Sequence, residues 1–142
     1  MKRKRKSALQ KRKDDPRSKY WCRKADNLWS GIIHALYPTC AVNDIDCKDD
    51  PQAHHLIPRT HRATRHDVEN GICLCSLHHE YSPRLSPHYG PVGFAAWLQA
   101  NEREKWEYVL AHKYEIGKVD YKSAYARLVA TAQRLGVAQE EK

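Results

Sequence analysis

This sequence of 142 residues contains no apolar run of about 18 residues, the length at which a segment is a candidate for crossing a bilayer. Its basic N-terminus is also not followed by the apolar stretch and cleavage site of a secretory signal. We therefore expect a soluble, cytoplasmic protein with no membrane partner. The length favours one compact unit with a modest core.

Acidic residues are absent from the first 13 positions, whereas 17 basic and 17 acidic residues balance from Asp14 onward. A block of like charge repels itself and usually stays disordered, and it can lie along a polyphosphate and release counterions. We interpret the block as an arm that binds nucleic acid; a solubilising tail or a localisation signal is the alternative. Its basic residues are Lys2, Arg3, Lys4, Arg5, Lys6, Lys11, Arg12 and Lys13.

Cysteine is scarce and odd in number, with five in the chain, so a disulfide framework is not expected. Several of these cysteines lie near one another and near histidine, which in a cytosolic chain favours a zinc site over a disulfide. Cys22 and Cys73 are expected to pack as small hydrophobic residues.

Histidine is concentrated, because seven of the nine lie between positions 54 and 88. His54 and His55 are adjacent, and His78 and His79 follow closely after Cys75. Imidazole can bind a metal or accept a proton near neutral pH without a large pKa shift. Function is therefore to be sought in this part of the chain.

The segment around these histidines predicts the local order strand, loop, strand, helix. Strands are expected at His54 to Ile57 and at Gly71 to Leu74, with an exposed polar loop from Arg59 to Asp67 between them. Ser76 is expected to cap a short helix that holds His78 and His79.

Apolar residues at helical spacing predict three further helices, at Tyr20 to Leu36, Phe94 to Lys113 and Tyr121 to Leu135. Pro38 ends the first, and Gly117 separates the other two. The expected organisation is a basic, disordered arm at 1–19, a helix at 20–38, the histidine-rich module at 39–90 and a helical extension at 91–142 that packs on the module.

Three motifs occur in a distinctive order: AHHLIPR at 53–59, NGICLC at 70–75 and the histidine pair at 78–79. Together they resemble the HNH endonucleases, especially the short forms of phages and mobile elements, over about residues 40–83. The resemblance implies an α+β fold, in which a small ββα-metal centre is stapled by a zinc knuckle and flanked by N- and C-terminal α-helices. It also implies the cytoplasm of a bacterial or phage-infected cell.

The resemblance assigns roles to four residues of these motifs. His55 stands in the position of the general base, and His54 and His79 stand in those of ligands to a catalytic divalent ion. Asn70 occupies the position that braces the ββα hairpin and helps to orient the base. Because neighbouring residues of a strand point to opposite faces, His54 and His55 would need a bend to serve one phosphate.

Two metal sites are expected. The catalytic ion would be Mg²⁺, Mn²⁺, Ni²⁺ or Zn²⁺, with a third ligand left open between His88 and water. A structural Zn²⁺ would have three thiolate ligands and one imidazole, with Cys73 as the substitute if Cys47 does not bind. The four expected zinc ligands are Cys40, Cys47, Cys75 and His78.

Three arginines of the predicted loop suit phosphate contact through their guanidinium groups. Arg59, the nearest to His55, is expected to clamp the scissile or an adjacent phosphate. Arg62 and Arg65 are expected to contact nucleic acid, with a solvated basic loop as the alternative.

The sequence thus favours a metal-dependent endonuclease that hydrolyses DNA, with double-stranded DNA as partner and one strand nicked per active site. The alternatives are a non-catalytic zinc module that binds nucleic acid, and a nuclease directed at RNA. A nucleophilic pair of Cys75 and His79 ranks last, because no orienting group or oxyanion hole is identified for it. The oligomeric state, and any phage packaging or recombination partner, are left open.

Overall fold

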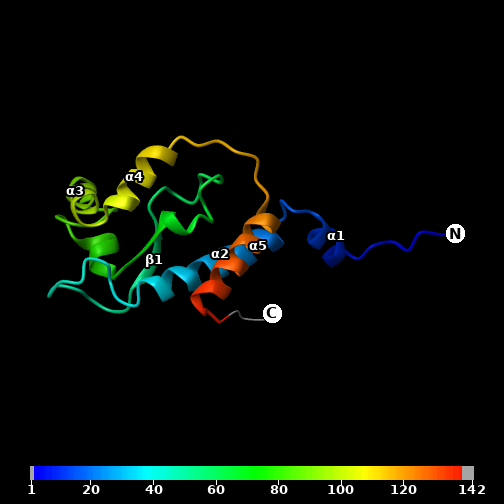
Figure 1. The fold of residues 1–142 in the computed structure, drawn as a ribbon, viewed down its shortest axis with the longest axis horizontal. Helices are drawn as coiled ribbons and strands as arrows, with labels where there is room; N and C mark the ends of the chain where they lie inside the picture. The colour runs from blue at the N-terminus through cyan, green and yellow to red at the C-terminus, as the bar shows by residue number, and fades with distance from the viewer. Residues whose placement is uncertain (1, 139–142) are drawn as a thin grey trace.

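A computed structural model describes residues 2–138 of the chain. Met1 and residues 139–142, the outer ends of the predicted arm and of the C-terminal extension, lie outside the described residues. The fold is α+β, as predicted, with helices around one two-stranded sheet (Figure 1). Within the described part of the chain, no helix has both the length and the apolar character needed to cross a membrane. The elements are α1 (Ala8–Asp14), α2 (Lys19–Leu36), β1 (Gln52–His55), η1 (Val68–Asn70), β2 (Gly71–Leu74), η2 (Leu77–Tyr81), α3 (Pro91–Asn101), α4 (Arg103–His112) and α5 (Tyr121–Leu135).

The sheet at the centre follows the predicted order of strand, loop, strand and helix. β1 pairs antiparallel with β2, with His54 opposite Ile72 and His55 opposite Gly71. β1 begins and ends two residues earlier than the predicted strand at His54 to Ile57. Just beyond β1, the Leu56 amide donates to the backbone carbonyl of Asn70 (2.9 Å) and the Ile57 amide donates to the side-chain oxygen of the same residue (2.7 Å).

η2 follows β2 closely and is a short π-helical turn that carries His78 and His79, as the sequence predicted for a helix after Ser76. In this turn the amide of Ser82 donates to the carbonyl of Leu77 (2.8 Å), five residues back. π-Helical turns are rare and often lie at functional sites.

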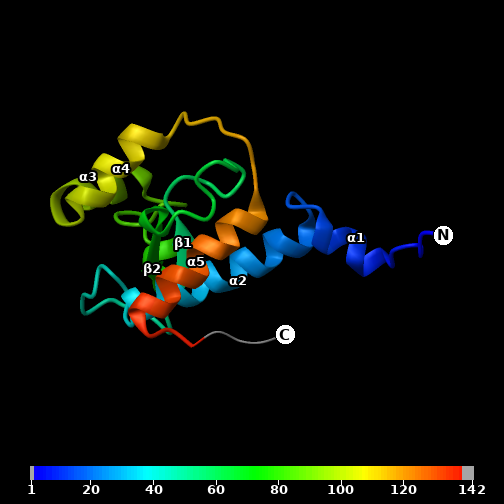
Figure 2. The same ribbon diagram turned by 45° about the vertical axis from the view of Figure 1, so that its right-hand side comes forward.

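α2 and α5 are the two longest helices and lie side by side in both views (Figures 1 and 2). They share a core with the strand residue Cys73, which is fully buried as expected for a small hydrophobic side chain. α5 thus packs on α2, which in turn contacts both strands of the sheet. The buried members of this core are Ala25, Trp29, Ile32, Ile33, Cys73, Leu128 and Ala132.

α3 and α4 replace the single helix predicted for Phe94 to Lys113. The chain breaks at Glu102, whose φ of −130° and ψ of 59° are not helical. The break lets each short helix turn its own apolar side inward, with Phe94 and Leu98 of α3 in a second core formed with Ile72 and Leu74. α3 begins at Pro91, which suits the first turn of a helix because it lacks an amide donor.

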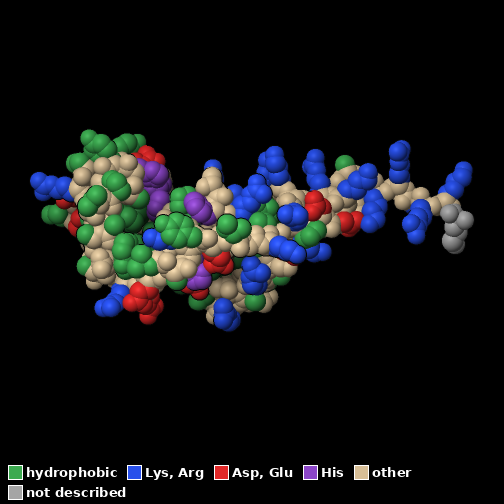
Figure 3. Space-filling model, turned by 90° about the horizontal axis from the view of Figure 1, so that it is seen from above, with side chains coloured by type: hydrophobic (Ala, Val, Ile, Leu, Met, Phe, Trp, Pro, Cys, Tyr) green, Lys and Arg blue, Asp and Glu red, His purple; other side chains and the backbone are tan. Residues whose placement is uncertain are grey.

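α1 lies inside the segment that the sequence predicted to be a disordered arm, and the structure differs there. Ser7 caps this helix by accepting a hydrogen bond from the amide of Gln10 (3.1 Å). The indole of Trp21 donates to the carbonyl of Lys13 (3.0 Å), which ties the end of α1 to α2. The N-terminal segment points away from the body (Figure 1), and Lys and Arg side chains project along it (Figure 3).

Candidate metal centres and active site

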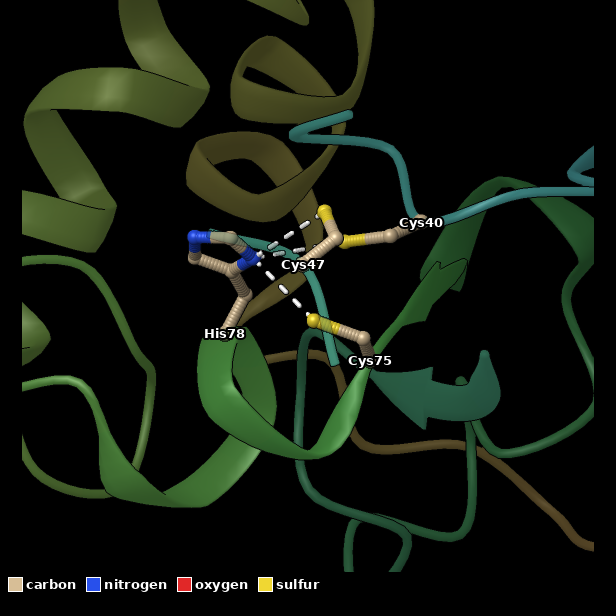
Figure 4. A group of neighbouring side chains, drawn as sticks. All are labelled: Cys40, Cys47, Cys75 and His78. Atoms are coloured by element: carbon tan, nitrogen blue, oxygen red, sulfur yellow. Dashed lines mark hydrogen bonds between the residues drawn. The ribbon is translucent and has the colours of Figure 1, made fainter. Parts of the chain in front are cut away.

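The four predicted zinc ligands come together at one end of the sheet (Figure 4). Cys40 and Cys47 flank the loop after α2, Cys75 directly follows β2, and His78 lies on η2. The Nδ1 atom of His78 lies 3.6 Å from the Sγ atoms of Cys40 and Cys47 and 3.2 Å from that of Cys75. This donor set of three thiols and one imidazole is that of a structural zinc site.

A carboxylate fixes the orientation of the His78 ring. The Nε2 atom of His78 lies 3.2 Å from Oδ2 of Asp44, in the loop between Cys40 and Cys47. A carboxylate at this distance favours the ring proton on Nε2 and a free lone pair on Nδ1, the atom nearest the thiols, as where a carboxylate supports a zinc-bound histidine. In the same knuckle, the carboxylate of Asp49 accepts from the amide (3.1 Å) and hydroxyl (2.7 Å) of Ser76.

The thiols of the knuckle show opposed pKa shifts. Burial raises the pKa of Cys75, but hydrogen bonds from the amides of His78 and Lys48 and from the His78 ring outweigh it and lower the pKa to about 7. Burial and the neighbouring thiols of Cys40 and Cys75 raise the pKa of Cys47 to about 12. The thiolate form is thus favoured at Cys75 and disfavoured at Cys47, and a bound cation is what would favour thiolate at both. The residues present fit a zinc ion.

A second cluster consists of imidazoles only. Nδ1 of His54 lies 3.0 Å from Nε2 of His79, and Nε2 of His88 lies 3.2 Å from the same atom. His54 and His79 are the predicted ligands of the catalytic ion, and the structure brings them together. His88, which the sequence left open as a third ligand, joins them.

Hydrogen bonds at two places position the histidines of this cluster. Nδ1 of His79 lies 3.1 Å from Oε1 of Gln52, which can only accept, so the proton of His79 is on Nδ1 and its Nε2 lone pair faces the other rings. Ser86, fully buried, organises the turn that presents His88. Its hydroxyl donates to the carbonyl of Ser82 (2.8 Å) and accepts from the amides of Tyr89 (3.0 Å) and Gly90 (3.2 Å).

The surroundings of two rings of the cluster, those of His54 and His79, favour the neutral form. Burial, followed by repulsion from His79, His88 and His55, lowers the pKa of His54 to about 3. Burial and repulsion from His88 also lower the pKa of His79. Neutral imidazoles with converging lone pairs suit a divalent transition-metal ion, so the residues present fit the predicted catalytic site.

His55 lies outside this cluster and has different neighbours. Its ring stacks on the indole of Trp29 in α2, with ring centroids 3.9 Å apart and planes 9° from parallel. Its Nε2 atom lies 2.9 Å from the carbonyl oxygen of Arg65, which can only accept a hydrogen bond. The neutral ring is therefore protonated at Nε2 and carries its lone pair on Nδ1. Burial lowers the pKa of His55, opposed in part by the Arg65 carbonyl and the charge of Asp26.

Asn70 is fully buried and holds the chain on both sides of the loop between the strands. Its side-chain carbonyl accepts from the amide of Ile57 (2.7 Å), and its side-chain nitrogen donates to the carbonyls of Ile57 (3.0 Å) and Thr64 (3.2 Å). These bonds join Ile57 and Thr64, at either side of the loop, to the residue that directly precedes β2.

The three loop arginines differ in exposure. Arg59 and Arg62 are exposed. Arg65, predicted to contact nucleic acid, instead turns its guanidinium into α2, where Nε and Nη2 donate to Asp26 at 2.9 and 2.7 Å. The sequence showed an arginine in a polar loop but not that the loop folds against an acidic residue almost 40 positions earlier.

The arm residues Lys2 to Lys6, Lys11 and Arg12 are exposed, and Lys13 is half-buried. Lys6 pairs with Asp14 (2.5 Å).

Cys75 and His79, weighed as a nucleophilic pair, belong to two different clusters. Gln52, Asp44, Trp29 and Asp26 were not singled out as site residues in the sequence, because only their contacts in the folded chain mark them.

The fold and its Cys/His clusters thus define a small α+β module of a kind suited to bind metal ions. Residues 40–82 match the family model described as HNH endonuclease, so this segment of the chain is an HNH endonuclease domain. A domain of this kind implies a nucleic-acid substrate and the use of divalent metal ions. The search of curated proteins and the search of solved structures found no match.

Proposed function

We propose that the protein is a metal-dependent endonuclease that hydrolyses phosphodiester bonds of DNA, with His55 as the general base. The observations that carry the proposal are the fixed tautomer of His55 and the cluster of three imidazoles, suited to hold a divalent ion, that includes its sequence neighbour His54. A non-catalytic zinc module would need neither of these arrangements, because its structural site already has four ligands.

Different residues of the proposed active site carry out different parts of the hydrolysis. Nδ1 of His55 takes a proton from water as the water oxygen bonds to phosphorus and the bond to the 3′ oxygen breaks. Trp29 and the Arg65 carbonyl hold the ring in place during this transfer. Exposed Arg59, four residues after His55, contacts a phosphate of the substrate. A divalent ion held by His54, His79 and His88 supplies positive charge to the phosphate and to the departing oxygen when bound.

The donor set also bears on the choice of ion. Mg²⁺ prefers oxygen ligands, whereas imidazole nitrogen suits Ni²⁺, Zn²⁺ and related ions. We expect Ni²⁺, Mn²⁺ or Zn²⁺ to support cleavage better than Mg²⁺. Since one chain holds one such cluster among its described residues, each active site is expected to nick one strand.

The test is conversion of supercoiled plasmid to its nicked form by the zinc-loaded protein with each ion, against EDTA. His55→Ala should reduce nicking to a small residual rate while DNA binding, measured by fluorescence anisotropy, stays near that of the parent. His61→Ala, an exposed histidine of the same loop, is the matched control and should nick normally. Nicking by His55→Ala at the parent rate would exclude His55 as the base, and cleavage of RNA in preference to DNA would change the substrate.

A further inference from the structure

Arg65 links the proposed base to a helix outside the HNH segment. Its carbonyl accepts from Nε2 of His55 (2.9 Å), and its guanidinium makes two hydrogen bonds to the carboxylate of Asp26 in α2 (2.9 and 2.7 Å). Two parallel bonds between a guanidinium and a carboxylate fix orientation as well as distance. The position of the Arg65 backbone, and of the bond to His55, is therefore set from α2.

α2 holds the next two residues of the same loop as well. Nε2 of His66 lies 2.7 Å from Oδ1 of Asp26, and the indole of Trp29 donates to the carbonyl of Asp67 (2.9 Å). Trp29 also stacks on the ring of His55. One face of α2 thus contacts the base directly and fixes the loop that holds the base.

A bound cation is not needed to explain the cluster around Asp26. Cys22, Asp26 and His66 lie close enough to resemble a metal site, but both carboxylate oxygens of Asp26 already face the positive guanidinium of Arg65. The side chains of Asp26 and Arg65 are only 31% and 19% exposed, so the pair is shielded in part from water. These contacts suit an anchor for the loop.

We propose that Asp26 is a positioning residue of the nuclease, which acts through Arg65 to keep the proton of His55 on Nε2 and its Nδ1 lone pair available to water. This inference rests on the proposed role of His55 as the base. It extends the working unit of the enzyme beyond residues 40–82, because α2 supplies both Asp26 and Trp29.

The test uses variants of the full, zinc-loaded chain in the plasmid-nicking assay with Ni²⁺. Asp26→Asn keeps the shape of the side chain but removes its charge, and Arg65→Lys keeps the charge but cannot bond to both carboxylate oxygens in the same plane. Each should lower kcat by about 10- to 100-fold with little change in KM or in Ni²⁺ affinity, because the base is misplaced while the substrate and ion ligands remain. Asp26→Glu should restore part of kcat.

The matched control is Glu107→Gln, which breaks the exposed pair of Arg103 and Glu107 on α4 (3.1 Å) and should leave nicking unchanged. A double variant then separates positioning from a general structural effect. If Asp26 acts through His55, adding Asp26→Asn to His55→Ala should cause no further loss of the residual activity. An equal loss in both backgrounds would overturn the inference.

Imidazole nitrogen NMR gives a readout that does not depend on cleavage. The parent should show the His55 proton on Nε2, and Asp26→Asn should show a mixture of both tautomers. Parent-like kcat in both Asp26→Asn and Arg65→Lys, each shown to be folded by circular dichroism, would overturn the inference while leaving the proposed function intact. Parent-like nicking by His55→Ala would overturn the proposed function, and the inference would fall with it.

Discussion

Gly71 shows how one absent side chain lets α2 approach the proposed base. It lies opposite His55 in the sheet, and a Cβ atom built on it would lie 2.3 Å from Cδ1 of Ile33 and 2.7 Å from Cζ2 of Trp29. Both distances are too short for carbon atoms in contact, so any side chain here would push the indole away from His55. Glycine is required at this position by close packing.

Gly71→Ala should therefore destabilise the protein by about 1–3 kcal/mol, the usual cost of overpacking a core, and lower the nicking rate as Trp29 moves. The measurements are urea denaturation and the plasmid assay on the same preparation. Gly31→Ala is the matched control, because Gly31 lies within α2 and nothing lies within 4 Å of its added Cβ. That variant should gain about 0.5–1 kcal/mol from higher helix propensity. Equal effects of the two substitutions would contradict this account of Gly71.

At the scale of elements, sequence patterns predicted those helices and strands that are determined mainly by their own residues. Apolar spacing gave α5 and nearly the bounds of α2, and the short apolar run gave β2. The bounds of β1 could not be read in this way, because the chain after His55 is held by the buried side chain of Asn70, which bonds to both the amide and the carbonyl of Ile57. The break at Glu102 likewise depends on what α3 and α4 pack against.

The residues of the candidate site likewise fall into two groups, those that sequence patterns predicted and those that only the contacts of the folded chain reveal. Cysteines close to histidine pointed to the four candidate zinc ligands, and the HNH motifs pointed to two of the clustered histidines, His54 and His79. His88 could only be suggested, because its approach to His79 depends on the folded turn around Ser86. Asp26 and Trp29 carry no motif, and their contacts join α2 to a loop almost 40 residues later.

The turn from Ser82 to Gly90 positions His88 near the other two histidines. The buried hydroxyl of Ser86 holds this turn, and a substitution can remove it. Ser86→Ala leaves the amide of Tyr89 without its side-chain acceptor and should cost about 1–3 kcal/mol. As the turn loosens, the affinity for Ni²⁺ at the histidine cluster should fall toward that of His88→Ala. Calorimetric titration of the zinc-loaded protein with Ni²⁺ measures both variants. Parent-like affinity in Ser86→Ala, with a clear loss in His88→Ala, would show that the turn holds its shape without the hydroxyl.

At the scale of the whole molecule, basic charge and the proposed active site lie in different parts of the chain. The N-terminal segment extends from the body with its Lys and Arg side chains exposed, while the histidine cluster belongs to the folded module (Figures 1 and 3). We propose that the arm contributes affinity for the phosphate backbone and the module contributes chemistry. This division predicts that the two can be weakened separately.

Replacing Arg3, Lys4 and Arg5 together with glutamine should weaken DNA binding and reduce its dependence on salt, while kcat at saturating DNA stays unchanged. The slope of log affinity against log salt should fall in magnitude by about 0.9 for each phosphate that the arm no longer neutralises, because each neutralised phosphate releases condensed counterions. Anisotropy titrations across a series of salt concentrations give the slope.

The control is the glutamine triple at Lys118, Arg127 and Arg134, three exposed basic residues in the C-terminal part of the chain, which removes the same net charge elsewhere. A general effect of net charge would change the slope equally in both triples, whereas direct binding of phosphate by the arm changes it only in the first. The proposed mechanism sets kcat at His55 and the residues that hold it. A matching fall of kcat in the arm triple would therefore mean that the arm also reaches the site of cleavage, and the proposed separation of binding from chemistry would not hold.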